Sequence, residues 1–359
     1  MKARLALLIL LQSGSSHGSP FSCWFPFSFK NRQNCSFVTG NRSIQKPSSI
    51  VAIRPKTGEY VWHFQETPED RWDFDSNQQI TVADLNIGGK VRHVIMHAPK
   101  NGFFYVLDAA TGQFISGKPF VEGINWARGL DPKTGKPDVN PDAKYELTGK
   151  PWLGFPGAVG AHSWTPMSFS PKTGLVYIPT NNTPQVYSHD PDWKPGTTGF
   201  QLGIDASPGN LPPNKAIRQA TAAAMTGALV AFDPVSGTVK WKVPQETPTN
   251  GGTLATAGNL VFQGTALGDF KAYTADTGKE LWSFHAQSGI LAAPMTYKVN
   301  GVQYRGDGSL GRRRLSLRPA LFGSLQPRQP RADPGVQARW RTGSAARSIA
   351  RTAGRSAPD

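Results

Sequence analysis

The chain has 359 residues, including 38 Gly and 30 Pro, and 38% of its residues are hydrophobic. This balance argues against a helical bundle and favours many short strands joined by tight turns. The net charge of +15 lies at the two ends, because residues 48–304 carry equal numbers of basic and acidic residues. A nucleic-acid-binding domain usually carries its basic patch on the folded body, so we expect no nucleic-acid partner.

The first 20 residues have the form of a signal peptide. Lys2 and Arg4 precede a short apolar run, 5–11, and small residues follow it. The run is too short to span a bilayer, so we expect an exported protein. Residues 21–47 contain the two cysteines, Cys23 and Cys35, which are available for one disulfide but lack the spacing of a disulfide framework, a zinc site or a haem-attachment motif. We expect this second segment to be disordered.

An internal repeat follows in residues 48–304. Three copies, 52–62, 231–241 and 272–282, place Thr or Ser before a glycine and Trp four residues after it. Residues 106–112 form a copy without the Trp, and 169–174 form a looser one. Each copy predicts a β-hairpin whose turn requires glycine at positive φ. The second and third copies are 41 residues apart, which is the length of a four-stranded propeller blade.

The tryptophans of these copies, Trp62, Trp241 and Trp282, stand at one fixed place after each turn. We expect them to pack between neighbouring blades. Segments 116–160 and 183–226 are long connections rich in Pro and Gly, and 216–225 is a candidate helix. The sequence therefore predicts an all-β fold with four to five blades' worth of chain.

The tail, 305–359, breaks this pattern. It contains twelve Arg and no Lys, and it shows no strand periodicity. A disordered basic tail is one interpretation. We favour the other, which is a reading frame shifted within a GC-rich gene.

Motifs along residues 48–304 resemble the second half of the pyrroloquinoline-quinone (PQQ)-dependent alcohol dehydrogenases, the quinoprotein and quinohaemoprotein enzymes. The stretches that carry the resemblance are 48–52, 58–65, 71–74, 98–108, 160–167, 250–254 and 258–265. The resemblance implies an eight-bladed β-propeller of four-stranded blades with tryptophan-docking repeats, of which this chain carries part. It also implies oxidation of an alcohol to an aldehyde by hydride transfer to PQQ, with Ca²⁺ or a lanthanide as Lewis acid.

The same resemblance assigns roles to individual residues. Asp73 matches the catalytic base and a metal ligand, and Asp75 matches an extra carboxylate ligand of lanthanide-using members. Alternation in an extended chain would put both carboxylates on the same side. Lys100 matches a lysine that hydrogen-bonds the quinone oxygens, and Asn250 matches a position close to the cofactor. His162 lies in a recognisable motif without a chemical role, so we expect it to be structural.

The resemblance further implies a small alcohol substrate, a cytochrome c-type electron acceptor and a periplasmic location. Contact with the membrane would be peripheral, through the electron-transfer partner. The Glu and Asn metal ligands of the family's first half and its cytochrome domain have no counterpart in this sequence. We therefore expect no haem in this chain, and little or no activity from it alone.

Two other functions compete with the dehydrogenase fragment. A non-catalytic β-propeller scaffold would share the repeat, but it has no use for Asp73, Asp75 and Lys100 at their matching places. A binder of nucleic acid or of membrane surfaces would rest on the basic ends alone.

Overall fold

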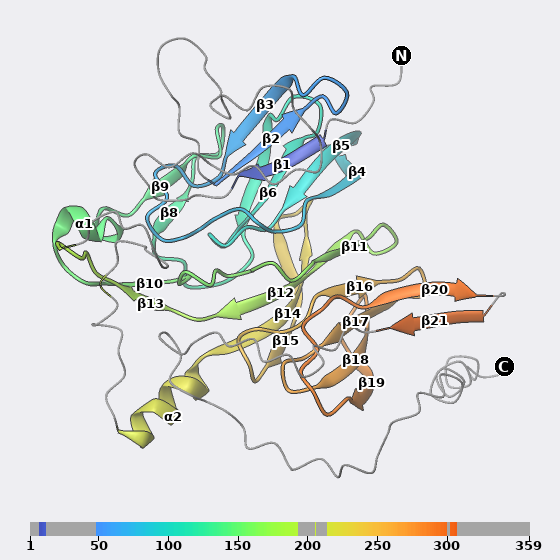
Figure 1. Cartoon of the computed structure of the whole chain (residues 1–359). Helices are drawn as coiled ribbons and strands as arrows, with labels where there is room; N and C mark the ends of the chain where they lie inside the picture. The colour runs from blue at the N-terminus through green and yellow to red at the C-terminus, as the bar shows by residue number, and fades with distance from the viewer. Residues whose placement is uncertain (1–6, 12–47, 193–204, 206–213, 300–301, 307–359) are drawn as a thin grey trace.

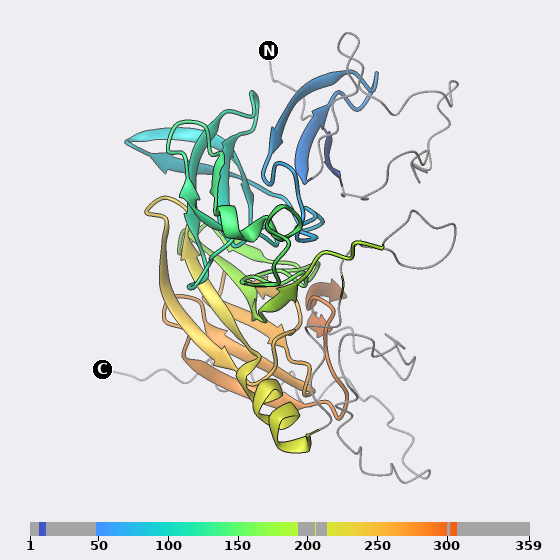
Figure 2. The ribbon, with the colours of Figure 1, turned by 90° about the vertical axis from the view of Figure 1, so that its left-hand side faces the viewer.

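The computed structural model describes residues 7–11, 48–192, 205, 214–299 and 302–306. The predicted segment 21–47 and nearly all of the predicted tail lie outside these residues. The described residues are mostly strands, which confirms the all-β class. Figures 1 and 2 show the sheets following one another in chain order, from the blue strands nearest the N-terminus to the orange ones. No sheet of the described part closes on itself.

Three four-stranded antiparallel sheets form the body. A smaller sheet precedes them and another follows them, so along the chain they are the second, third and fourth of five sheets, with two short strand pairs left out of this count. The second sheet has the order β4 (Thr81–Ile87), β5 (Lys90–His97), β6 (Phe103–Asp108), β7 (Phe114–Pro119). The third has the order β11 (Ser168–Ser170), β12 (Leu175–Asn182), β14 (Thr226–Asp233), β15 (Thr238–Gln245). The fourth has the order β16 (Thr253–Ala255), β17 (Leu260–Gly264), β18 (Asp269–Thr274), β19 (Glu280–His285).

Smaller elements lie before, between and after these sheets. The first sheet has three strands, β1 (Leu7–Leu11), β2 (Ser49–Ile53) and β3 (Tyr60–Gln65), and the fifth has two, β20 (Met295–Val299) and β21 (Val302–Gly306). Two short pairs are β8 (Ala127–Leu130) with β9 (Pro137–Val139), and β10 (Trp152–Gly154) with β13 (Gln185–Tyr187). The helices are a 3₁₀ turn (Pro141–Ala143), α1 (Tyr145–Thr148) and α2 (Lys215–Ala224), and α2 coincides with the predicted helix. No helix of the described part is long and apolar enough to cross a membrane.

The predicted glycine turns form the outer hairpins of the sheets. In the hairpins β2–β3, β6–β7, β14–β15 and β18–β19, the glycine has φ between 68° and 71° and its N–H donates to the carbonyl four residues earlier. Each of these hairpins also has a β-bulge next to the turn. The same turn closes β8–β9, where Gly135 N donates to Asp131 O at 2.8 Å. Sequence analysis missed this last copy and treated it as part of a long connection.

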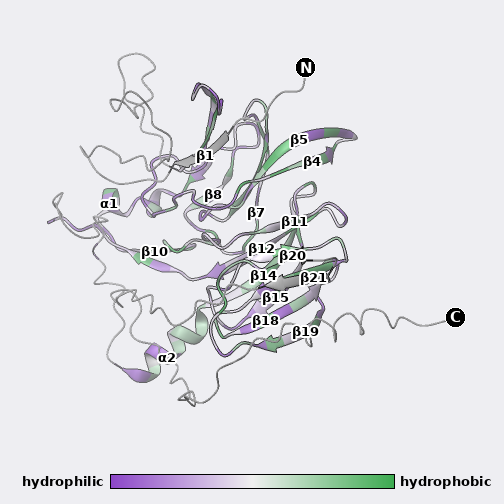
Figure 3. Cartoon of the chain, turned by 45° about the vertical axis from the view of Figure 1, so that its right-hand side comes forward, coloured by the Kyte–Doolittle hydropathy of each residue, from purple (hydrophilic) through white to green (hydrophobic). Residues whose placement is uncertain are grey.

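Apolar side chains fill the space between consecutive sheets. Between the second and third sheets, Phe104 packs on Phe232 with ring centroids 4.7 Å apart. β5 changes along its length: its first half is mostly exposed and hydrophilic, and its second half is buried and mostly hydrophobic (Figure 3). The core is therefore a series of layers between neighbouring sheets.

Tryptophans on the outer strands also lie in these layers. A Cβ atom on Gly112 of the second sheet would lie 2.5 Å from the ring of Trp62 of the first. A Cβ atom on Gly278 of the fourth sheet would lie 2.6 Å from the ring of Trp241 of the third, whose Nε1 donates to Ala275 O at 3.1 Å. A side chain at either position would collide with the indole ring. Only glycine therefore fits beneath each of these two tryptophans.

Candidate functional site

The loop between β3 and β4 brings two carboxylates to the turn between β5 and β6, which carries Lys100. Lys100 Nζ donates to the backbone oxygen of Asp73 at 2.9 Å and to its Oδ2 at 3.2 Å. It also donates to Asp75 Oδ1. Three of the four predicted site residues therefore meet, and all three ammonium hydrogens have an acceptor.

Three consecutive carbonyl groups of the loop accept hydrogen bonds from three separate parts of the chain. Tyr145 OH donates to Arg71 O at 2.9 Å, and Tyr187 OH donates to Trp72 O at 3.0 Å. The next carbonyl is the one that accepts from Lys100. Since Tyr145 lies on α1 and Tyr187 on β13, elements far apart in sequence fix the position of the loop backbone.

The backbone of Asp73 itself is in the left-handed region, with φ of 63°. Asp is one of the few residue types other than Gly that adopt this conformation, and the cost is of order 1–3 kcal/mol. Asp70 stabilises the bend, because its Oδ1 accepts from the N–H groups of Trp72 and Phe74 at 3.0 Å each. The surroundings thus hold Asp73 in one conformation.

Burial differs among the three charged groups. The side chains of Asp75 and Lys100 are 2% and 8% exposed, whereas that of Asp73 is 28% exposed. Burial raises the pKa of Asp73 to about 6, against the opposing effect of the Lys100 ammonium, and the charge of Asp75 raises it further. A carboxylate that is reachable from solvent and has a pKa near neutrality is suited to act as a general base.

The segment before β11 supports the lysine turn from behind. Gly160, at φ of 85°, leaves space that the Cβ and Cγ atoms of Lys100 occupy, and Ala161 N donates to Lys100 O at 2.9 Å. The ring nitrogens of buried His162 lie 2.7 Å from Ala98 O and from Thr165 O. Burial lowers the pKa of His162 to about 4, so the ring is neutral near pH 7. This geometry fits the expected structural role of the histidine.

A second pair of titratable side chains lies beside the site, and sequence analysis missed it. Glu66 and His97 are both fully buried, with His97 Nδ1 2.7 Å from Glu66 Oε1. Ser76 Oγ donates to Glu66 Oε2 at 2.7 Å, and His97 Nε2 lies 3.2 Å from Gln78 O. Because Ser76 follows Asp75 directly, the pair fixes the chain on the far side of the carboxylates.

Asn250, predicted near the cofactor, lies elsewhere in the hydrogen-bond network. Its Nδ2 donates to Thr247 O at 2.7 Å, and its Oδ1 accepts from Thr247 Oγ1 at 2.9 Å and from Ala266 N at 3.2 Å. These bonds join the β15–β16 connection to the turn between β17 and β18. They do not link Asn250 to the Asp73–Lys100 cluster.

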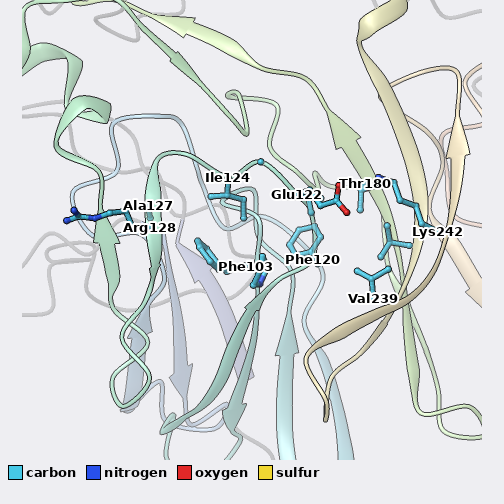
Figure 4. A pocket seen from close by; sticks show the side chains of 13 residues that line it. Phe103, Phe120, Glu122, Ile124, Ala127, Arg128, Thr180, Val239 and Lys242 are labelled. Carbon is cyan, nitrogen blue, oxygen red and sulfur yellow. The ribbon is translucent and has the colours of Figure 1, made fainter.

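A cavity of about 430 Å³ lies between the second and third sheets (Figure 4). Its walls include Phe103, Phe120 and Ile124, and the side chains of Glu122 and Lys242 approach it from one end. None of the predicted site residues lines it. The cavity is therefore separate from the Asp73–Lys100 cluster.

Asp73 and Asp75 offer carboxylate oxygens to a hard cation. Ca²⁺ takes six to eight oxygen ligands, and carboxylates are ligands of the right kind. Among the described residues, however, no group of three His, Cys, Asp or Glu side chains is arranged to hold a metal ion. The carboxylates of Asp73 and Asp75 are donors of the kind that such an ion takes, and two of them would make up only part of its ligand set.

Comparisons with known proteins agree with the fold. The family model for the β-propeller domain of glucose, ethanol and alcohol dehydrogenases (PQQ) matches residues 30–118 and 232–304. The dehydrogenase subunit of alcohol dehydrogenase (quinone) from Komagataeibacter europaeus is 54% identical over 257 residues, which cover 71% of this chain and 35% of that protein. Quinohemoprotein alcohol dehydrogenase ADH IIB of Pseudomonas putida is 46% identical over 305 residues, covering 83% of this chain and 40% of the relative.

Solved structures give the same result. The quinohemoprotein alcohol dehydrogenase ADHIIG of Pseudomonas putida HK5 superposes with a TM-score of 0.70 and 48% identity, over 73% of this chain and 38% of that one. A europium-containing methanol dehydrogenase superposes with a TM-score of 0.60 and 32% identity, over 72% of this chain and 44% of that one.

The succession of sheets and these superpositions define a part of a β-propeller of the PQQ-binding class. The chain belongs to the quinoprotein alcohol dehydrogenase family. It spans only part of the length of its curated relatives, between 34% and 42% for these and similar alcohol dehydrogenases. The family match starts at residue 30, before the boundary at residue 48 that the motifs predicted.

Proposed function

We propose that this chain is the part of a PQQ-dependent alcohol dehydrogenase that carries the catalytic base, Asp73, and a cofactor lysine, Lys100. The observation that carries the proposal is the Asp73–Lys100 cluster. It places a solvent-accessible carboxylate with a raised pKa against a buried ammonium, on a loop held from three sides. The whole enzyme would oxidise an alcohol to an aldehyde.

In this proposal Asp73 accepts the proton of the alcohol hydroxyl. PQQ, when bound, accepts the hydride from the alcohol carbon. Lys100 would donate to a quinone oxygen, and since its three hydrogens already have acceptors, one existing bond must be replaced. The 3.2 Å bond to Asp73 Oδ2 is the one we assign to this exchange. Its loss would make Asp73 more basic, because Lys100 lowers the pKa of that carboxyl.

Asp73 and Asp75 would supply two oxygen ligands to Ca²⁺ or a lanthanide, which would act as a Lewis acid toward the quinone. The remaining ligands would come from outside the described residues. We therefore expect little dehydrogenase activity from the isolated chain.

The name of one relative narrows the choice of alcohol substrate and of electron acceptor. A 1-butanol dehydrogenase (cytochrome c) of Thauera butanivorans is 46% identical over 266 residues. We infer a small alcohol as substrate and a cytochrome c-type protein as acceptor, with the enzyme in the periplasm and in peripheral contact with the membrane through that acceptor. The non-catalytic scaffold remains less well supported, because it gives no reason for a strained Asp73 beside Lys100.

The proposal is tested by PQQ binding to the chain, measured by equilibrium dialysis with Ca²⁺ or La³⁺ present. We expect Lys100→Ala to weaken binding at least tenfold, since a charge-assisted hydrogen bond is lost. The matched control is Lys133→Ala, which removes an exposed turn lysine and should bind as the wild type does. Equal binding by wild type and Lys100→Ala, or no binding by wild type, would contradict the proposal.

A further inference from the structure

The two ends of the described body are complementary halves of one sheet. In each complete sheet a glycine turn with a β-bulge beside it joins the third and fourth strands, as in β6–β7, β14–β15 and β18–β19. The similar Gly174 turn between β11 and β12 has no bulge. The hairpin β2–β3 has the same turn and the same bulge, so it corresponds to a third and a fourth strand. The first sheet therefore contains the outer half of a sheet.

The fifth sheet contains the other half. β16 and β17 open the fourth sheet eight residues after β15 ends, and β20 and β21 follow the end of β19 after ten. Both pairs are antiparallel and come at the same place in the repeat. Within the described residues, β20 and β21 are thus a first and a second strand without a third.

The packing surfaces at the two ends also match. Trp62 and Trp241 each cover a glycine of the following sheet, and both of these glycines are buried. Trp282, at the equivalent place in the fourth sheet, contacts Phe270 and Phe284 of its own sheet instead. Its neighbours Phe284 and Leu281 are 43% and 52% exposed. This end of the body presents a tryptophan surface of the kind that elsewhere receives a glycine turn.

The opposite end presents such a turn. In the β2–β3 hairpin, Thr57 is exposed and Gly58, at φ of 70°, is only half-buried. By the register of the repeat, Pro55 O corresponds to Ala275 O, which accepts the indole N–H of Trp241. The turn thus offers both the flat glycine and the carbonyl that a docked tryptophan uses.

We propose that two copies of this chain close on each other, with β20–β21 of one protomer and β2–β3 of its partner forming one four-stranded sheet. Trp282 would then pack on Gly58 of the other protomer. Each protomer has three complete sheets and contributes two halves, so the closed pair has eight sheets. A head-to-tail contact that closes in two steps gives a finite dimer.

Burial of apolar surface and new backbone hydrogen bonds favour a second copy of the chain as the partner. β20 has two exposed apolar side chains, Met295 and Tyr297, which the composite sheet would cover. The edge of β21 would gain the ladder of hydrogen bonds that an edge strand lacks. Residues 48–304 carry no net charge, so two copies do not repel each other as whole bodies. β1 pairs with the edge of β2 that β21 would use, so β1 competes with dimerisation.

The experiment is light scattering coupled to size exclusion on the full chain, over a hundredfold range of concentration. We expect a mass of twice 38.9 kDa for the wild type at high concentration. Gly58→Asn keeps a residue that tolerates positive φ but adds a side chain where the indole would lie. It should weaken dimerisation at least tenfold. Its matched control is Gly88→Asn, at φ of 60° with no atom near its missing Cβ, which should dimerise as the wild type does.

Two more variants test the other surfaces. Trp282→Ala should also be monomeric, whereas Trp164→Ala, which removes a tryptophan that is exposed elsewhere, should not. Ile9→Pro, in β1, should raise the dimer fraction by removing a backbone donor from the competing strand. Far-ultraviolet circular dichroism identifies any variant that has lost its strands. A monomeric wild type, a dimer indifferent to both Gly58→Asn and Trp282→Ala, or an open series of larger oligomers would overturn the proposal.

Discussion

Two clusters of titratable side chains each join the loop between β3 and β4 to the end of β5 or the turn after it, and they differ in access to solvent. Glu66 and His97 are sealed, and each has a second hydrogen-bond partner within the protein. Asp73 and Lys100 have comparable partners, but the carboxylate is more than a quarter exposed. His97 and Lys100 are only three residues apart in the chain. The comparison shows that the sealed pair fixes the backbone, whereas the carboxylate of the open pair stays accessible to solvent.

The largest effect is expected from breaking the sealed pair. Glu66→Ala leaves His97 and Ser76 without their buried partner, which should lower the free energy of unfolding by about 3–5 kcal/mol. Urea unfolding followed by tryptophan fluorescence measures the change. Glu66→Gln keeps the shape and one acceptor, so it should cost less than the alanine. A loss below about 1 kcal/mol for Glu66→Ala would remove the distinction between the two clusters.

A smaller effect is expected when a methyl group is added next to the Lys100 side chain of the open pair. Gly160→Ala puts a methyl group into the stem of Lys100 and forces a side chain onto a residue at positive φ. We expect a loss of about 2–3 kcal/mol in urea unfolding, from overpacking and backbone strain together. Gly174→Ala is the control, because it shares the positive φ but has no atom near its missing Cβ. Equal losses for the two variants would show that Lys100 is not confined by Gly160.

The open pair should also give a pH-dependent signature. Because the pKa of Asp73 is about 6 in the folded chain against 3.8 ordinarily, its contribution to stability is complete below about pH 4 and is lost as the pH rises to about 6. Asp73→Asn avoids this loss. Above pH 6 it should be more stable than wild type by about 1–2 kcal/mol, a value reduced for solvent screening.

Thermal unfolding at pH 4.5 and at pH 7.5 measures this difference. Buried His162, whose pKa is lowered to about 4, destabilises both proteins equally in acid and so cancels. A stability difference that is the same at both pH values would contradict the raised pKa of Asp73.

The smallest effect is expected at an exposed pair. Arg128 and Asp138 join the short hairpin β8–β9 at 3.0 Å, with both side chains more than half exposed. Arg128→Ala should change the free energy of unfolding by about 0.5 kcal/mol or less in urea unfolding. If Arg128→Ala lowered the free energy of unfolding nearly as much as Glu66→Ala, burial would not explain the difference in stability between buried and exposed pairs.

The sequence predicted local features better than distant contacts. The glycine turns were predictable because a residue at positive φ leaves a local signature. The packing of Trp62 and Trp241 between sheets followed from their constant spacing, whereas Trp282, expected to pack in the same way, contacts Phe270 and Phe284 of its own sheet. Asp73, Asp75 and Lys100 were found through the family resemblance. Glu66 and His97 were missed because they are 31 residues apart and neither lies in a motif. Asn250 shows the reverse, since its motif was recognisable but its hydrogen bonds serve the adjoining turns.

The succession of sheets has a consequence for how the chain folds. Each complete sheet is built from one continuous stretch of sequence and packs mainly on its immediate neighbours, as the units of a repeat protein do. Stability then grows as a sum over units and the junctions between them, and folding can nucleate in any unit. A chain with only some of the units loses junctions at its ends, while the interior junctions persist. The Asp73–Lys100 cluster belongs to such an interior junction, between the first and second sheets.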